Sequence, residues 1–258
     1  MKFVQVITAL ALAVSFVAAG FAACLAPPVT HALAGAFVRA DISPFSHDQL
    51  VEVADATREF SFGNHDLEQL YRTIYDIDRQ YADKLSPSEL AKLQGFPKLV
   101  ALSGHDDLEQ LQLAFKDVSQ LYAYDVQTIS HLDDCYKLLV NVRPGLIIAA
   151  VLAVAGLIAV GVRGGRKMLG AVLMGAGIAV VAALVALGVW ALIDFNGFFT
   201  AFHQAFFAQQ GNWTFPYDSL LICSLPEAFW MGMGTVWLVV ALALSAASVL
   251  VGNRLRKE

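Results

Sequence analysis

Four stretches of the chain carry no charged residue, and each is long enough to cross a lipid bilayer as a helix. They cover residues 3–26, 145–162, 168–193 and 228–252. At about 1.5 Å of rise per residue, these lengths match the roughly 30 Å of hydrocarbon that a spanning helix crosses. The pattern predicts a mainly α-helical, polytopic membrane protein with four transmembrane helices.

Polar positions gather in the segments between these stretches. Residues 27–144 form one large polar block, which we expect to be a mostly helical extracytoplasmic domain between the first and second transmembrane helices. The shorter polar segments are a cytoplasmic loop at 163–167, an extracytoplasmic loop at 194–227 and a cytoplasmic tail at 253–258. This division gives the chain one sizeable water-facing domain.

Helix-start signals divide the polar block. Ser46, Asn64 and Gly104 each open a short segment with a His-Asp pair, followed by apolar residues three and four positions apart. We expect the first residue of each segment to cap a helix, and Ser86 before Pro87 repeats the signal. The three His-Asp pairs also suggest a metal-dependent phosphohydrolase. That reaction needs further ligands on converging helices, so capping is the prediction, with no metal site.

Two more helical patterns flank the apolar stretches. Residues 108–139 keep a helical period, with a break expected near Tyr122 to Asp125. After the third apolar stretch, aromatic residues recur at spacings of three and four through 198–207. Aromatic rings at this density are typical of the membrane interface, so we expect an interfacial helix there.

Basic residues place both ends of the chain on the cytoplasmic side. Lys2 and the clusters within 163–167 and 254–257 all fall on one side if every apolar stretch crosses the bilayer. The positive-inside rule makes that side cytoplasmic. The outward block 27–144 then holds 18 acidic and 10 basic residues. Binding to nucleic acid needs basic clusters, so no nucleic-acid partner is predicted.

Composition agrees with a membrane protein. The 258 residues are 57% apolar and 15% charged, with a mean hydropathy of +0.60. Soluble domains lie nearer to about 45–50% apolar and about 25% charged, which excludes an ordinary soluble enzyme. The four apolar stretches also contain no Asp, Glu, Lys, Arg or His, which argues against a pump or channel.

The three cysteines are too few for a disulfide scaffold. Cys135 and Cys223 both lie in outward segments, so their pairing stays open. Cys24 ends Phe21-Ala-Ala-Cys24, which is similar to the lipobox of a lipoprotein signal. Because Lys2 is the only charge before the apolar run, we favour an uncleaved first helix over a processed signal.

Two histidines stand apart from the helix-start pairs and from His31, which lies in a predicted loop. His131 precedes the second apolar stretch and His203 follows the third, so both are expected at the outer membrane surface. On a helix Asp134 could orient His131, while Phe199 would lie one turn before His203. The usual hydrolase, zinc and phosphate-binding motifs are missing. Spacing alone leaves two interpretations, a base in a partly dry site or structural histidines.

Two segments carry a resemblance to a known family. His131-Leu-Asp-Asp134 is similar to a His-Met-x-Asp-Val motif, with Leu132 and Cys135 in place of Met and Val. The second segment resembles the signature region of the bacterial lipoprotein intramolecular transacylase (Lit) family, as does the four-span order. Its matching residues are Phe198-Phe199, Phe202-His203, Phe206-Phe207, Trp213, Phe215-Pro216, Asp218, Leu221-Ile222, Pro226-Glu227 and Phe229-Trp230.

The resemblance implies an activity in the bacterial plasma membrane. The protein would move the sn-2 acyl chain of a diacylglyceryl-modified lipoprotein onto the amino group of its N-terminal cysteine, giving the lyso form. Diacylglyceryl lipoproteins and membrane lipid would be its partners, and ester aminolysis needs no cofactor. His203 and His131 would be catalytic, and the sequence leaves open which one is the base. The implied supporting residues are Asp134, Phe199, Phe202, Phe206, Trp213 and Glu227.

Two other function classes remain at this stage. One is a non-catalytic membrane protein whose acidic ectodomain binds a partner while both histidines are structural. The other is a membrane hydrolase, although Ser130 and Cys135 are merely close in sequence to a histidine. The oligomeric state also stays open.

Overall fold

The computed structural model describes residues 1–103, 106–207 and 213–257. Within these ranges the chain forms helices and connecting turns and no strand, which confirms the mainly α-helical prediction. The helices are α1 (Lys2–Cys24), α2 (Pro27–Phe37), α3 (His47–Phe62), α4 (Leu67–Ala82), α5 (Pro87–Leu90), α6 (Phe96–Val100), α7 (Leu108–Phe115), α8 (Val126–Ile193), α9 (Phe195–Phe207), α10 (Leu220–Ser224) and α11 (Glu227–Lys257).

The chain divides into two compact units. The first, here called the apolar unit, contains residues 1–24, 140–206 and 233–258. The second, here called the polar unit, contains residues 25–139 and 207–232. The helix α8 therefore begins in the polar unit and continues into the apolar unit.

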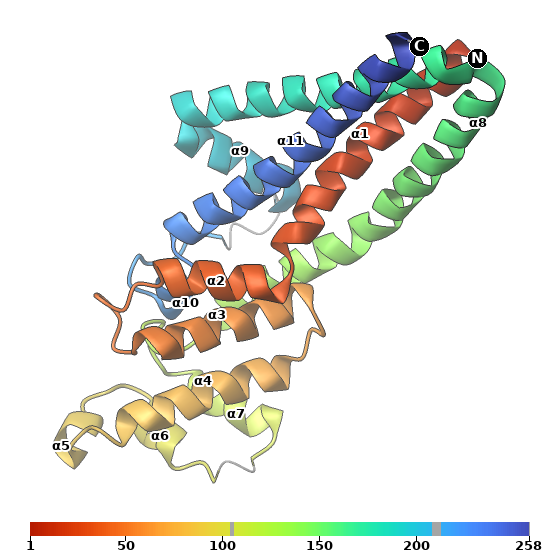
Figure 1. Ribbon diagram of the computed structural model, residues 1–258. Coiled ribbons are helices and arrows are strands. Elements are labelled where there is room, and N and C mark those ends of the chain that lie inside the picture. Colours follow the sequence, from red (N-terminus) through yellow and green to blue (C-terminus); the bar gives the residue numbers. More distant parts are fainter. Residues whose placement is uncertain (104–105, 208–212, 258) are drawn as a thin grey trace. The chain divides into compact units, whose positions relative to one another are not determined.

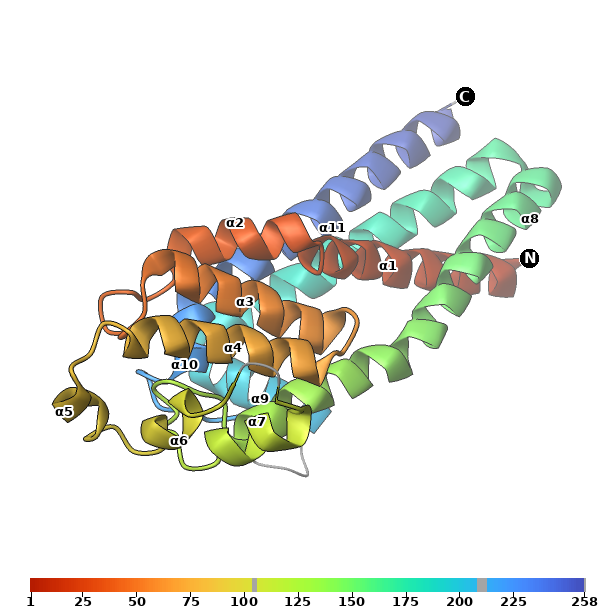
Figure 2. The same cartoon turned by 90° about the horizontal axis from the view of Figure 1, so that it is seen from below.

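Within the described ranges, three helices are long and apolar enough, by length and composition, to cross a membrane. These are α1, α8 and α11. With 68 residues, α8 is broken at Gly165, which has a φ of 72° and a ψ of −179°. Glycine adopts this left-handed φ without the steric penalty of a side chain. The break divides α8 into two arms, which diverge from a sharp bend (Figures 1 and 2).

The helices of the apolar unit approach one another through small residues and a few polar contacts. A Cβ atom on Gly177 of α8 would lie 2.6 Å from the carbonyl oxygen of Ser245 in α11, so only glycine fits there. Trp237 of α11 donates its indole N–H to the carbonyl oxygen of Val17 in α1 at 3.0 Å. Close backbone packing of this kind is typical of helices in lipid.

The polar unit has a layered helical core. In it α2 packs on α3, α3 packs on α4, and α6 and α7 pack against α4 (Figure 1). The apolar residues of α4 at three- and four-residue spacing, including Leu70, Ile74 and Tyr75, are buried. Burial of this stripe holds the polar unit together as a water-soluble domain would be held.

The predicted caps at Ser46 and Ser86 are confirmed. Ser46 accepts a hydrogen bond from the backbone N–H of Gln49, whose side chain accepts from the N–H of Ser46. Ser86 and Glu89 form the same reciprocal pair at the start of α5, with Pro87 in the first turn. These capping boxes satisfy N–H groups that have no partner inside the helix.

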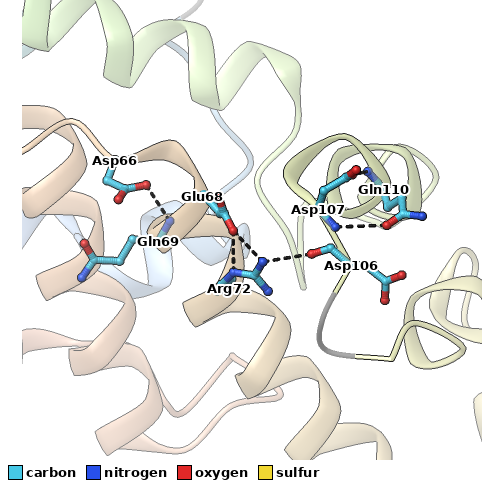
Figure 3. Close-up of polar contacts among 7 residues, drawn as sticks. All are labelled: Asp66, Glu68, Gln69, Arg72, Asp106, Asp107 and Gln110. Atoms are coloured by element: carbon cyan, nitrogen blue, oxygen red, sulfur yellow. Dashed lines mark hydrogen bonds and ion pairs between the residues drawn. The ribbon is translucent and has the colours of Figure 1, made fainter.

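The predicted cap at Asn64 is wrong, because α4 begins two residues later. Its cap is Asp66, whose side chain accepts from the N–H of Gln69 at 3.0 Å (Figure 3). Asn64 instead accepts from the N–H of Asp66 at 3.0 Å, in a side-chain turn that precedes the helix. Short polar side chains favour both a helix cap and a turn before a helix. The spacing of residues along the sequence therefore did not distinguish the two arrangements.

The start of α7 shows the same shift. Gly104 and His105 lie outside the described residues, and the cap is Asp107, which pairs with Gln110 in a capping box. Arg72 of α4 donates to the carbonyl oxygen of Asp106 at 2.9 Å and ties the start of α7 to α4 (Figure 3).

One other expectation needs correction, and the open cysteine pairing is answered. His31 lies in α2 rather than in a loop, and its Nδ1 is 2.7 Å from a carboxylate oxygen of Asp55 in α3. Prolines occupy the first turn of α2, which a helix tolerates because N–H groups there lack a helical partner. Cys135 and Cys223 do not pair, since both are free thiols.

Candidate functional site

The helix that carries His131 has a well-defined start. α7 ends at Phe115 and α8 begins at Val126, so the expected break near residues 122–125 is confirmed. The carboxylate of Asp125 accepts from both the backbone N–H and the hydroxyl of Thr128 at 2.8 Å. This cap fixes the helix less than two turns before His131.

The ring of His131 packs against aromatic rings from the second polar segment. Its centroid lies 5.3 Å from that of Phe207 and 5.8 Å from that of Phe215. A hydrogen bond joins the same segments, because the side-chain amide of Gln127 donates to the carbonyl oxygen of Thr214 at 3.2 Å. The polar unit therefore brings together the two segments that carry the family resemblance.

Cys135 lies next to His131 but is poorly suited to be a nucleophile. Its sulfur is 3.9 Å from Nε2 of His131, one helical turn away. Burial, and then the carboxylate of Asp134, raise the pKa of Cys135 to about 12. A thiol with this pKa stays protonated near neutral pH, and the thiolate is the reactive form.

His203 lies on α9 and is held by its own helix. Its Nδ1 is 2.9 Å from the carbonyl oxygen of Phe199, one turn earlier. A carbonyl oxygen can only accept, so Nδ1 carries the hydrogen and Nε2 of the neutral ring carries the lone pair. Burial lowers the pKa of His203, although the bond to Phe199 opposes this. The lowered pKa favours the neutral form of the His203 ring.

Phenylalanine rings lie beside His203, and several of them are exposed on α9. The Phe199 ring lies 4.0 Å and the Phe202 ring 5.4 Å from the His203 ring, between centroids. The Phe206 ring lies 4.9 Å from that of Phe202, tilted by 54°, and is half exposed, whereas Phe207 at the helix end is buried. This confirms the predicted aromatic helix, whose exposed rings suit the membrane interface.

The remaining predicted residues lie in the polar unit. Trp213 is half-buried, and Asp134 follows His131 by three residues on α8. Glu227 is exposed in the first turn of α11, where a carboxylate is favourable beside the positive end of the helix. Among the described residues, no three His, Cys, Asp or Glu side chains are arranged to hold a metal ion.

The contacts of His131 with Phe207 and Phe215 were not predicted from the sequence. Both phenylalanines appear in the resembling segment, but their spacing gives no distance to another helix. The one available signal was that both motif segments are expected at the outer membrane surface.

The fold and these histidines define a membrane-integral helical protein with imidazole groups set among aromatic rings. The family model for the lipoprotein intramolecular transacylase Lit matches residues 82–230, more than half of the chain. The chain belongs to this family. It is therefore an acyltransferase enzyme that acts within a lipoprotein, as the name of the family states.

Solved structures give the same fold. The in meso structure of the membrane-integral lipoprotein intramolecular transacylase Lit from Bacillus cereus has a TM-score of 0.66 and 16% identity, covering 99% of this chain and 95% of that one. Two structures of Bacillus cereus Lit with a histidine replaced by arginine or alanine each have a TM-score of 0.63 and 16% identity. They cover 99% of this chain and 92% and 93% of theirs. No curated protein matches the chain.

Proposed function

We propose that this enzyme moves the sn-2 acyl chain of a diacylglyceryl-modified lipoprotein onto the amino group of the same N-terminal cysteine. The amine attacks the ester carbonyl, an amide bond forms, and the ester bond to glycerol breaks to leave the lyso form. The observation that carries the residue assignment is the packing of His131 against Phe207 and Phe215, which joins the two motif segments.

His203 is the proposed base and acid. An α-amino group has an ordinary pKa of about 7.7–8.0, so its proton must leave as it attacks the ester. Nε2 of His203 takes that proton and returns it to the departing glycerol oxygen. The lowered pKa supports this role because it favours the neutral ring, and the bond from Nδ1 to Phe199 supports it because it fixes the tautomer.

His131 is the proposed partner of the developing oxyanion. A donor directed at the carbonyl oxygen stabilises the charge that appears as the amine attacks. Asp134 is proposed to steady the His131 ring from the next turn of α8. Since amine and ester belong to one molecule, orientation alone supplies about 7–11 kcal/mol of the barrier reduction.

The aromatic residues are proposed to hold the substrate at the lipid surface. Drawing an acyl chain out of the bilayer costs about 0.8 kcal/mol per CH₂ group, so the ester must be reached from the membrane side. The exposed rings of Phe199, Phe202 and Phe206 suit contact with acyl chains. Trp213 and Glu227 complete the proposed site near the head group.

The proposed topology has four crossings in the bacterial plasma membrane with both chain ends in the cytoplasm. A straight helix of 68 residues would be roughly 100 Å long, over three times the hydrocarbon thickness. The break at Gly165 lies between Arg163 and Arg166, which supports two spans at 145–162 and 168–193 with a cytoplasmic turn. Residues 27–144 and 194–227 then face outward.

Replacement of His203 by asparagine tests the mechanism. The asparagine amide can donate to Phe199 as Nδ1 does, but it has no group at the position of Nε2. We expect acyl transfer to fall by about 10²–10⁴-fold with normal expression, because a general base is lost. Mass spectrometry of a diacylglyceryl lipopeptide in membranes measures its conversion to the N-acylated lyso form.

The neighbouring Gln204→Ala is the matched control, since Gln204 is exposed on the same helix. It should keep the parent rate. If His203→Asn converts the lipopeptide within a few-fold of that rate, the histidine is structural and the mechanism is wrong.

Two exposed lysines test the topology. An impermeant thiol reagent in intact cells should label Lys92→Cys in the proposed outer block and leave Lys167→Cys unlabelled until the cells are broken. Labelling of Lys167→Cys in intact cells would overturn the orientation.

A further inference from the structure

His65 lies in the turn before α4 with a backbone conformation that side chains rarely adopt. Its φ of 60° falls in the left-handed region, and it is the one non-glycine residue there among those that the structure describes. Such a conformation persists only where the surroundings hold it. The contacts of this side chain therefore explain the turn.

The His65 ring is held on both faces and at both nitrogens. It stacks between Phe60 and Tyr136, with centroid distances of 4.4 Å and 3.8 Å and interplanar angles of 15° and 6°. Nδ1 lies 2.8 Å from the carbonyl oxygen of Phe60, and Nε2 lies 3.1 Å from Oδ1 of Asp133. His65 thus joins the end of α3 to the beginning of α8.

The residues that His65 contacts on α8 lie on the opposite side from His131. At about 100° per residue, Asp133 and Tyr136 share one face, whereas His131 is about 200° away from Asp133. Cys135, which is near His131, shares the His131 face. Asp133 is also paired with Lys137, one turn further along α8.

We propose that His65 is a positioning residue that fixes the rotation of the first turns of α8 and thereby the direction of His131. A rotation of α8 would carry His131 away from Phe207 and Phe215, and small displacements of reacting groups cost large factors in rate. The inference rests on the role proposed above for His131. His65 precedes the matched region 82–230, and Asp133 occupies the variable position of the resembled motif.

Two replacements of His65 distinguish its role in the left-handed turn from its hydrogen bond to Asp133 of α8. Asparagine tolerates the left-handed conformation and can donate to Phe60, but it is too short to reach Asp133. Glutamine is long enough to donate to Asp133. In the full-length protein we expect His65→Asn to lower kcat by about tenfold or more with KM within about twofold. His65→Gln should recover most of that loss.

Alkylation of Cys135 reports the rotation without relying on catalysis. Its rate is followed by mass spectrometry of the peptide, with the buried Cys223 as the internal reference. We expect the rate to change by about threefold or more in His65→Asn and to return towards the parent rate in His65→Gln. Thermal unfolding checks that both variants fold.

The outcomes distinguish this inference from the proposed function. If His65→Asn leaves both kcat and Cys135 alkylation within about twofold of the parent, the positioning role is overturned. If His131→Ala stays active, the proposed role of His131 is wrong. Alkylation of Cys135 then decides alone whether His65 fixes α8: a changed rate supports it and an unchanged rate overturns it.

Discussion

The apolar and polar units bury their side chains in different ways. In the apolar unit large residues point outward, with Val162 81% and Leu192 88% exposed, and the helices meet at small residues such as Gly177. In the polar unit the large residues point inward, with Leu50 and Ile74 at most 1% exposed. The first pattern suits a surface covered by lipid and the second a surface covered by water.

The candidate histidines differ in a similar way. His203 in the apolar unit is held by Phe199 and Phe202 of its own helix. His131 in the polar unit is packed by Phe207 and Phe215, which are far away in the sequence. Local geometry thus sets the tautomer of one imidazole, whereas tertiary packing sets the surroundings of the other. Changes at Phe215, which is remote in sequence, should therefore affect the surroundings of His131.

After His203→Asn, the largest expected effect comes from removing the imidazole of His131 in the polar unit. His131→Ala should lower lipopeptide conversion by about 10²–10³-fold, the usual cost of losing one oxyanion donor. His47→Ala, which removes a half-exposed histidine of the same unit, should keep the parent rate. The measurement is the mass-spectrometric assay in membranes. A rate for His131→Ala within about threefold of the parent would leave His203 as the one catalytic histidine.

Two glycines of α8 test how the apolar unit packs. A Cβ on Gly177 would meet the backbone of Ser245 at 2.6 Å, whereas a Cβ on Gly175 would meet nothing within 4 Å. We expect Gly177→Ala to destabilise the protein by about 1–3 kcal/mol through overpacking. Gly175→Ala should stabilise it by about 1 kcal/mol or less through helix propensity. Thermal unfolding in detergent compares them, and equal shifts would contradict the close packing.

A buried acid makes the polar unit sensitive to pH. Asp78 is fully buried in α4, and burial raises its pKa well above the ordinary value. Because the folded-state pKa is the higher one, the folded protein loses stability as pH rises above the unfolded-state value of about 3.8. The loss is at most about 1.4 kcal/mol per pH unit and ends once pH passes the folded-state pKa.

Asp78→Asn should remove this dependence. Its unfolding temperature should exceed that of the parent by an amount that grows from pH 5 towards pH 8. Asp76→Asn, which changes an exposed carboxyl on the same helix, should follow the parent at every pH. A constant difference between Asp78→Asn and the parent would show that Asp78 does not titrate in this range.

The smallest expected effect concerns the packing of His131. Loss of one aromatic contact removes about 0.5–1.5 kcal/mol of interaction free energy. Phe215→Ala should therefore slow acyl transfer by about tenfold or less. Tyr217→Ala, two residues later and 71% exposed, should have no effect. Kinetics at saturating lipopeptide give the comparison. Equal rates for the parent and Phe215→Ala would mean that the imidazole does not depend on this ring.

Local rules determined much of the molecule from the sequence. The helical class, the aromatic helix around His203 and the caps at Ser46 and Ser86 depend on residues within one or two turns, so their spacing predicts them. The same rules failed at His31 and Asn64, where prolines in a first turn and a side-chain turn before a helix each allow two local structures.

Only the tertiary structure decided what surrounds His131. Phe207 and Phe215 reach it across the fold, and His65 bonds Asp133 although the two are 68 positions apart. These contacts depend on how helices pack and loops close, and hydrophobic spacing along the chain carries no information about either. The sequence therefore determined which residues could act, and packing decided what lies beside them.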